Sequence, residues 1–242
     1  MKVQRGRDGK ASLIISHEEI ETQMQAALRT AGFYPTEAAP AVDIEDFVEK
    51  HLKVRVDGYA ELPREVLGYT KFQPNKRPRI YINGDLTEEA MDREDSPNWK
   101  KGRWRATMAH EASHVILHRV LFTGSSKLQR TGASGGEGEI PGSPVQRCLK
   151  RDVQFGGRTF DSREVQANRG MAALLMPKAL FCGLCAAELG TTQFAAGIRK
   201  GTPDAEELVR TMSDRFEVSR QAAAIRLETL RIVVPAFAQA LV

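Results

Sequence analysis

The first clear pattern along the chain is an apolar stripe of helical period between Ser16 and Gly32. Three large apolar residues recur at every fourth position and so share one helix face; they are Ile20, Met24 and Leu28. Ser16 followed by Glu19 is a capping box that predicts where the helix begins, and Gly32 predicts where it ends. A short second helix is expected over 44–51, capped by Asp43.

A strand pattern follows and then gives way to helices. Residues 52–56 alternate apolar and basic side chains, and 67–72 and 79–82 are rich in β-formers, so two or three strands are predicted. Periodic apolar positions predict a helix over 104–120 and another over 162–176, the latter ended by Pro177. The element order therefore predicts an α+β protein.

Three regions are expected: an N-terminal arm and helix in 1–35, a principal domain in 36–200 and a helical segment in 201–242. Residues 123–157 are rich in Gly, Ser and Pro and contain little to bury. They predict a long mobile insertion within the principal domain.

The last segment, 203–232, predicts two helices broken near 216–218. This is the outline of a helix-turn-helix DNA-binding pair, in which Arg220 and Arg226 would face phosphates. The other interpretation, which we favour, is a helical pair that packs on the principal domain and helps to grip a substrate.

Composition narrows the class of protein. No apolar run approaches the roughly 20 residues that span a bilayer, and no apolar segment of signal-peptide length follows the basic N-terminus. Three cysteines are an odd number and fit a reducing compartment. We therefore expect a cytoplasmic protein with no membrane partner. The formal net charge of +4 mildly favours acidic partners.

The chemistry is concentrated in the H-E-x-x-H motif of residues 110–114. Residues i and i+4 of a helix lie on one face about 6 Å apart, so His110 and His114 can converge on one zinc ion. Glu111 is placed to act as general base on a metal-bound water. A solvated helix face is the alternative for an isolated motif of this length.

A catalytic zinc needs a third protein ligand and an open fourth position. His118 lies about 12 Å along the helix axis from His110, which is too far for the same ion, so we interpret it as a packing or second-shell residue. Glu164, on a separate predicted helix, is the better third ligand. Asn168 lies one turn further along that helix, where its oxygen can accept a hydrogen bond from a ligand histidine. Glu164 as a capping-box residue is the alternative.

Three segments of the chain resemble the ImmA/IrrE family of zinc metallopeptidases. They are Ala41-Val42-Asp43-Ile44 with the strands after it, Arg105 to His118 around the motif, and Glu164 to Asn168 followed by Leu174-Leu175-Met176-Pro177. The resemblance covers about residues 40–180 and implies zinc held by His110, His114 and Glu164, with Glu111 as base. The chain departs from the pattern at Gly170 and Met171, where the family usually has an aromatic residue and an alanine, and at Ser113, which replaces a glycine.

The resemblance implies a zincin-like arrangement. A small antiparallel sheet is expected to pack on the H-E-x-x-H helix and on the second ligand-bearing helix. It also implies an endopeptidase that cleaves a helix-turn-helix transcriptional repressor in a stress, defence or mobile-element response. Single-stranded DNA or another DNA-damage signal is a possible activator. The alternative is a DNA-binding regulator whose zinc site is structural or vestigial.

Two further residue assignments are hypotheses. Cys148 lies between the two ligand segments beside Arg147 and Lys150, which favour its thiolate, and a thiolate can fill the fourth zinc position and silence the enzyme. A free surface thiol is the alternative. The donor that stabilises the oxyanion is not identified by the sequence, and Tyr69 and Tyr81 are only candidates.

Overall fold

The computed structural model describes residues 2–5, 11–73, 76–91, 98–123, 145–149, 161–191, 194 and 197–235. Its helices are α1 (His17–Ala31), α2 (Ile44–Asp46), the π-helical turn η1 (Phe47–His51), α3 (Gly84–Met91), α4 (Asn98–Thr123), α5 (Ser162–Leu175), α6 (Lys178–Glu188), α7 (Pro203–Phe216) and α8 (Arg220–Thr229). Its strands are β1 (Lys2–Arg5), β2 (Ala11–Ile14), β3 (Arg55–Ala60), β4 (Val66–Lys71), β5 (Arg79–Asn83), β6 (Val145–Leu149), β7 (Ile198–Arg199) and β8 (Val233–Val234). The protein is α+β, as expected.

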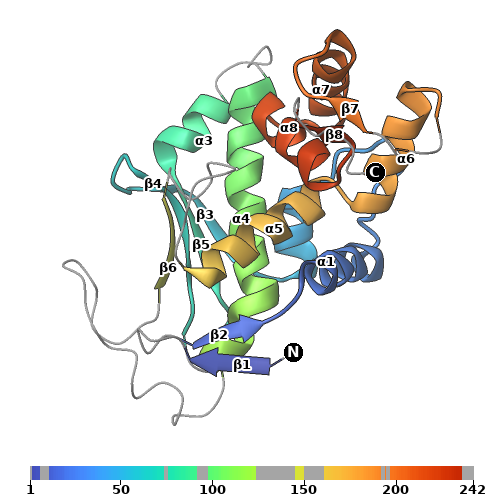
Figure 1. Ribbon diagram of the computed structural model, residues 1–242. Helices are drawn as coiled ribbons and strands as arrows, with labels where there is room; N and C mark the ends of the chain where they lie inside the picture. The colour runs from blue at the N-terminus through green and yellow to red at the C-terminus, as the bar shows by residue number, and fades with distance from the viewer. Residues whose placement is uncertain are drawn as a thin grey trace.

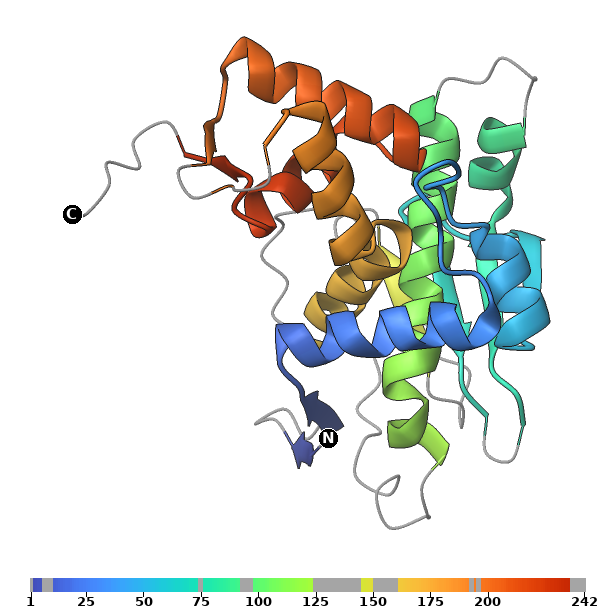
Figure 2. The ribbon, with the colours of Figure 1, turned by 90° about the vertical axis from the view of Figure 1, so that its right-hand side faces the viewer.

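Helix α4 is the central helix of the protein. It runs through the centre with the sheet on one side, while α5 and α1 cross its other side (Figures 1 and 2). Residues 106–115 are all buried, although five of these ten residues are polar or ionisable. A helix covered on all sides must find partners for every polar side chain it carries, and those partners define the site described below.

The sheet beside α4 has the strand order β3-β5-β4-β6. Strand β5 lies between β3 and β4, pairing antiparallel with β4 and parallel with β3. The expectation of an antiparallel sheet was therefore wrong, and the sheet is mixed. The reason is the strand order: β4 follows β3 along the chain but does not lie beside it. β5 lies between them, antiparallel to β4 and therefore parallel to β3.

The sheet has an inner face toward α4 and an outer face away from it. Ile80 and Ile82 of β5 are completely buried on the inner face, and Thr70 of β4 lies beside them. Successive residues of a strand point to opposite faces, so Tyr81 and Tyr69 lie on the outer face. Their rings stack on each other with centroids 4.5 Å apart.

Local sequence signals predicted several elements well. The capping box of α1 is present, with Glu19 N donating to Ser16 Oγ at 3.2 Å and Ser16 N donating to Glu19 Oε2 at 2.7 Å. Gly32 ends the helix in the left-handed region at φ 74°. The predicted strand at 52–56 instead begins at Arg55, because residues 52–54 close the π-helical turn.

Some elements were not expected. The polar arm contains the hairpin β1–β2, in which Lys2 is in register with Ile14. The predicted insertion contains the strand β6, which pairs with β4; residues 124–144 and 150–157 of that insertion lie outside the described part. Helices α3 and α6 were also missed. Within the described residues no single helix is long and apolar enough to span a membrane, and the one bent pair that meets the criteria by length and composition is α5 with α6.

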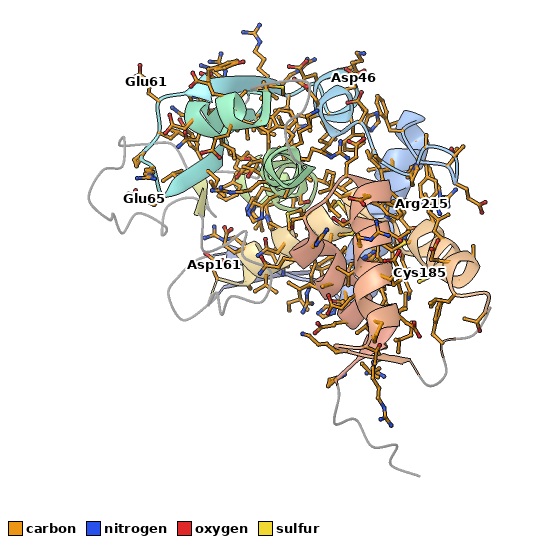
Figure 3. All side chains as sticks on the ribbon, turned by 90° about the horizontal axis from the view of Figure 1, so that it is seen from above. Asp46, Glu61, Glu65, Asp161, Cys185 and Arg215 are labelled. Atoms are coloured by element: carbon orange, nitrogen blue, oxygen red, sulfur yellow. The ribbon has the colours of Figure 1, made fainter. Side chains whose placement is uncertain are left out.

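The expected C-terminal helical pair is present as α7 and α8. Its N-caps are Thr202 and Ser219, and its apolar residues belong to the same buried cluster as those of α4. Figure 3 shows Arg215 in this helical group and Glu61 and Glu65 on the opposite, sheet side.

Arg226 does not face phosphates as a DNA-binding pair would need. Its side chain is 3% exposed, forms an ion pair with Glu21 of α1 and donates to Met176 O at 2.7 Å. Arg226 therefore ties α8 to α1 and to the end of α5, which favours the packing interpretation of the pair.

Gly170 is where α5 comes closest to α4. A Cβ built on Gly170 would lie 2.6 Å from Ser113 Oγ and 2.8 Å from Ser113 Cβ. Positions 113 and 170 are therefore coupled, because the space that a side chain at 170 would need is occupied by Ser113.

We predict that Gly170→Ala destabilises the protein by about 1–3 kcal/mol, because overpacking outweighs the gain in helix propensity. The matched control is Gly183→Ala in α6, where nothing lies within 4 Å of a new Cβ and stability should rise. Urea unfolding of both variants and of Ser113→Gly/Gly170→Ala measures the effect. Ser113→Gly/Gly170→Ala should regain most of the stability that Gly170→Ala loses. Equal stabilisation by Gly170→Ala and Gly183→Ala would contradict the close contact of position 170 with Ser113.

Candidate metal centre

His110 and His114 stand one turn apart on the inner part of α4. Their rings meet edge to face with centroids 4.8 Å apart, and both side chains are fully buried. Their Nε2 atoms are 3.1 Å from each other. The spacing of the motif therefore places two imidazole nitrogens at one point, as predicted.

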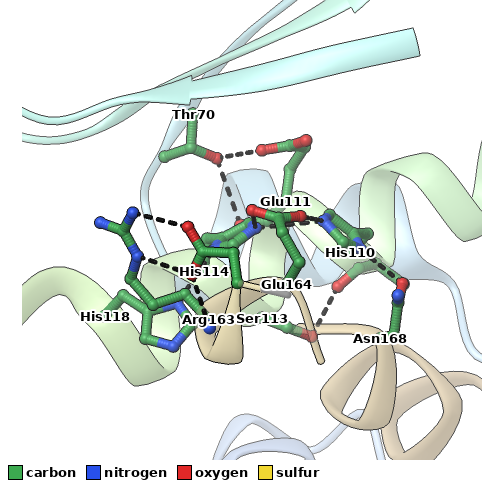
Figure 4. A network of polar contacts seen from close by, with 11 residues as sticks. Thr70, His110, Glu111, Ser113, His114, His118, Arg163, Glu164 and Asn168 are labelled. Carbon is green, nitrogen blue, oxygen red and sulfur yellow. Dashed lines mark hydrogen bonds and ion pairs between the residues drawn. The ribbon is translucent and has the colours of Figure 1, made fainter. Parts of the chain in front are cut away.

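Helix α5 brings the third side chain. Glu164 Oε2 lies 3.1 Å from His110 Nε2, and Glu164 Oε1 lies 3.5 Å from His114 Nε2 (Figure 4). Zinc bonds of about 2.0–2.1 Å in tetrahedral geometry place ligand atoms about 3.3 Å apart. The two Nε2 atoms are 3.1 Å apart and Glu164 Oε2 lies 3.1 Å from His110 Nε2, both close to that value, whereas the 3.5 Å contact with His114 is made by the other carboxylate oxygen. One ligand atom from each of the three residues lies within 4.8 Å of the others, so the predicted set could hold a metal ion.

Asn168 orients the first histidine. Its Oδ1 lies 2.9 Å from His110 Nδ1, which is the contact expected from the sequence. The amide oxygen is an acceptor, so His110 Nδ1 carries the proton and donates it. His110 Nε2 is then left with its lone pair toward the centre.

The second histidine is oriented by a longer chain of hydrogen bonds. Gln166 Nε2 donates to Leu13 O at 2.7 Å, which leaves Gln166 Oε1 to accept from His118 Nε2 at 2.9 Å. Burial lowers the pKa of His118 to about 3, so its ring is neutral and its Nδ1 is an acceptor. His114 Nδ1, 2.8 Å away, is therefore the donor, and His114 Nε2 keeps its lone pair.

The donor set fits a cation. With these tautomers, two lone pairs and a carboxylate converge at one buried point with no proton to share, an arrangement that a divalent ion would satisfy. Burial lowers the pKa of His114 and keeps it neutral. Burial alone would raise the pKa of Glu164, but hydrogen bonds to the two histidines hold it below its ordinary value.

Glu111 points from the same helix toward the sheet. Its Oε2 accepts from Thr70 Oγ1 at 2.6 Å, while its Oε1 is buried and has no hydrogen-bond partner. Burial raises the pKa of Glu111 to about 8, although His110 and the Thr70 hydroxyl oppose the rise. A buried carboxylate with one orphaned oxygen beside a metal-binding triad is placed to take up a proton.

Sequence reasoning missed Thr70, Gln166 and Leu13. The sequence contains a weak signal for Thr70, because it is a polar residue at an inward-facing position of a predicted strand. Gln166 left none, since its role depends on a carbonyl 153 residues earlier in the chain. His118 contacts His114 through their Nδ1 atoms, which are 2.8 Å apart.

The structure bears differently on the two further residue assignments, the tyrosines as oxyanion donors and Cys148 as a fourth zinc ligand. Tyr69 and Tyr81 lie on the outer face of the sheet, away from the metal-binding side chains, so they are not oxyanion donors. The backbone of Cys148 belongs to β6, in register with Gly68, and not to a loop. Its side chain lies outside the described residues, so its role as a fourth ligand stays a hypothesis.

Comparisons of the chain with protein-family models, with curated proteins and with solved structures find no match in any of the three. The geometry of the side chains is therefore what supports a functional assignment.

We predict that His118→Phe weakens zinc binding by about 10–100-fold. The Nδ1–H of His114 loses its acceptor, so the His114 ring is no longer held in one tautomer. Competition with a chelating dye measures the affinity. His51→Phe, a half-buried histidine that stacks on Phe47, is the control and should bind zinc normally. Unchanged affinity in both His118→Phe and Gln166→Leu would contradict the role of the chain of hydrogen bonds.

Proposed function

We propose that the protein is a zinc-dependent endopeptidase. The observation that carries the proposal is Glu111, a buried carboxylate with an orphaned oxygen next to three side chains spaced as zinc ligands. A site that only stabilised the fold would be complete with its ligands and would not bury a further carboxylate. The choice of zinc rests on the two imidazoles and one carboxylate of the donor set.

Zinc held by His110, His114 and Glu164 would polarise a peptide carbonyl and make a water acidic near neutral pH. Glu111 would take up a proton on its free oxygen and return it to the leaving amine. Thr70 holds the other oxygen, so the carboxylate keeps one orientation during both transfers. Of the three ligands only Glu164, at 4%, has any exposed surface, so a substrate would approach from its side.

The substrate class rests on the resemblance to the ImmA/IrrE family. It points to a helix-turn-helix transcriptional repressor, cleaved in a stress, defence or mobile-element response. A DNA-damage signal, such as single-stranded DNA, would activate the cleavage. The alternative of a DNA-binding regulator loses one of its two arginines, because Arg226 is engaged within the fold, while Arg220 is exposed.

We predict that Glu111→Gln lowers peptide hydrolysis by about 10²–10⁴-fold while zinc stays bound, since only the proton carrier is lost. The assay is co-expression with a candidate helix-turn-helix repressor, read as cleavage on a gel, with zinc content measured in parallel. Full cleavage by this variant would exclude the mechanism. Absence of cleavage by the wild type, with zinc present, would favour a structural site.

A second variant tests the orientation of the base. Thr70→Val keeps the size of the side chain and removes the donor to Glu111, so we expect a smaller fall in rate, about tenfold, with unchanged zinc content. Removing zinc with a chelator should abolish hydrolysis in the wild type, and adding zinc back should restore it. A rate in Thr70→Val equal to that of the wild type would contradict this role of the hydroxyl.

A further inference from the structure

A pocket of about 390 Å³ at one end of the sheet is lined almost entirely by cations. Its lining residues are Lys53, Arg55, Gln73, Lys76, Arg77, Pro78 and Arg79. All five cationic side chains are exposed, and none of them takes part in the ion pairs among the described residues. The pocket therefore holds a concentrated positive charge that the described part of the fold does not neutralise.

The register of the strands extends this charge across the outer face of the sheet. Arg55 is directly opposite Arg79, and Arg79 is directly opposite Lys71. Neighbouring strands are about 4.8 Å apart, and like charges at facing positions destabilise a sheet. The row Arg55–Arg79–Lys71 is thus a cost to folding that an anionic ligand would offset.

Lys53 adds a second observation. Its backbone is in the left-handed region at φ 53°, which favours glycine and costs a residue with a side chain about 1–2 kcal/mol. The Lys53 side chain is exposed and contributes charge to the pocket.

The aromatic pair lies on the same face. Tyr69 and Tyr81 are half-buried and come two residues from Lys71 and Arg79 along their strands. Cations that contact phosphates beside aromatic rings that contact bases are the usual composition of surfaces that bind single-stranded nucleic acid.

We propose that this surface, which we call the basic sheet face, binds the phosphodiester backbone of a single-stranded nucleic acid. It consists of Lys53, Arg55, Lys71, Lys76, Arg77 and Arg79, with the two tyrosines beside them. A small phosphate compound is a poorer fit, because every cation of the pocket is exposed and spread along the surface instead of enclosing one anion. The binding does not depend on the hydrolase activity, so the two proposals can fail separately.

The test is fluorescence anisotropy of the full chain with a labelled 20-nucleotide single strand, as DNA and as RNA. Contacts to about five phosphates give a slope of about −3.5 in log affinity against log salt, which is about a 100-fold loss between 50 and 200 mM. The duplex of the same sequence and poly-glutamate are competitors. Both should compete at least tenfold less well than the unlabelled single strand.

Matched variants locate the surface. Arg55→Ala/Arg79→Ala should weaken binding at least tenfold and make the salt slope shallower by about 1.4. Lys53→Gly should weaken binding and leave the melting temperature equal or higher, since it removes the charge and relieves the backbone. Lys178→Ala/Arg220→Ala removes two exposed cations elsewhere and should bind like the wild type.

Three results would overturn the proposal. One is the absence of salt-dependent binding at 50 mM salt. Another is equal competition by the duplex or by poly-glutamate, which would make the surface a general polyanion site. The third is a loss in Lys178→Ala/Arg220→Ala as large as in Arg55→Ala/Arg79→Ala, which would move the contact to the C-terminal helices.

Discussion

The close approach of α5 to α4 at Gly170 is the constraint on which the metal centre depends. Because Gly170 has no side chain, the two helices come near enough for Glu164 to reach across to both histidines of α4. The same approach places Asn168 and Gln166 against the outer nitrogens of His110 and His118. One missing Cβ thus allows a single helix to supply a ligand and two orienting side chains.

The sequence predicted which side chains meet at the centre better than it predicted the contacts that orient them. His110 and His114 follow from helix periodicity alone, and the Glu164 assignment needed a second helix and the family resemblance. Thr70 and Leu13 act over 41 and 153 residues of chain. No local pattern encodes which strand faces a helix or which carbonyl an arm brings to it, so these contacts could not be inferred.

The fold shows the same division between local and distant information. The capped helix α1 was predicted to the residue at its N-cap, because capping uses only neighbouring residues. The direction of β3 relative to β5 was missed, since it depends on where β5 inserts and not on alternation within either strand. The partner of Arg226 could not be inferred for a similar reason, because Glu21 lies 205 residues earlier.

The order of the ligands along the chain has a consequence for biosynthesis. His110 and Glu164 are separated by 54 residues, with the predicted insertion between them. A chain emerging from the ribosome at about 5–20 residues per second presents both imidazoles several seconds before the carboxylate that completes the triad. Until α5 has emerged, the nascent polypeptide offers only the two imidazoles, so the complete donor set becomes available only once α5 has been synthesised.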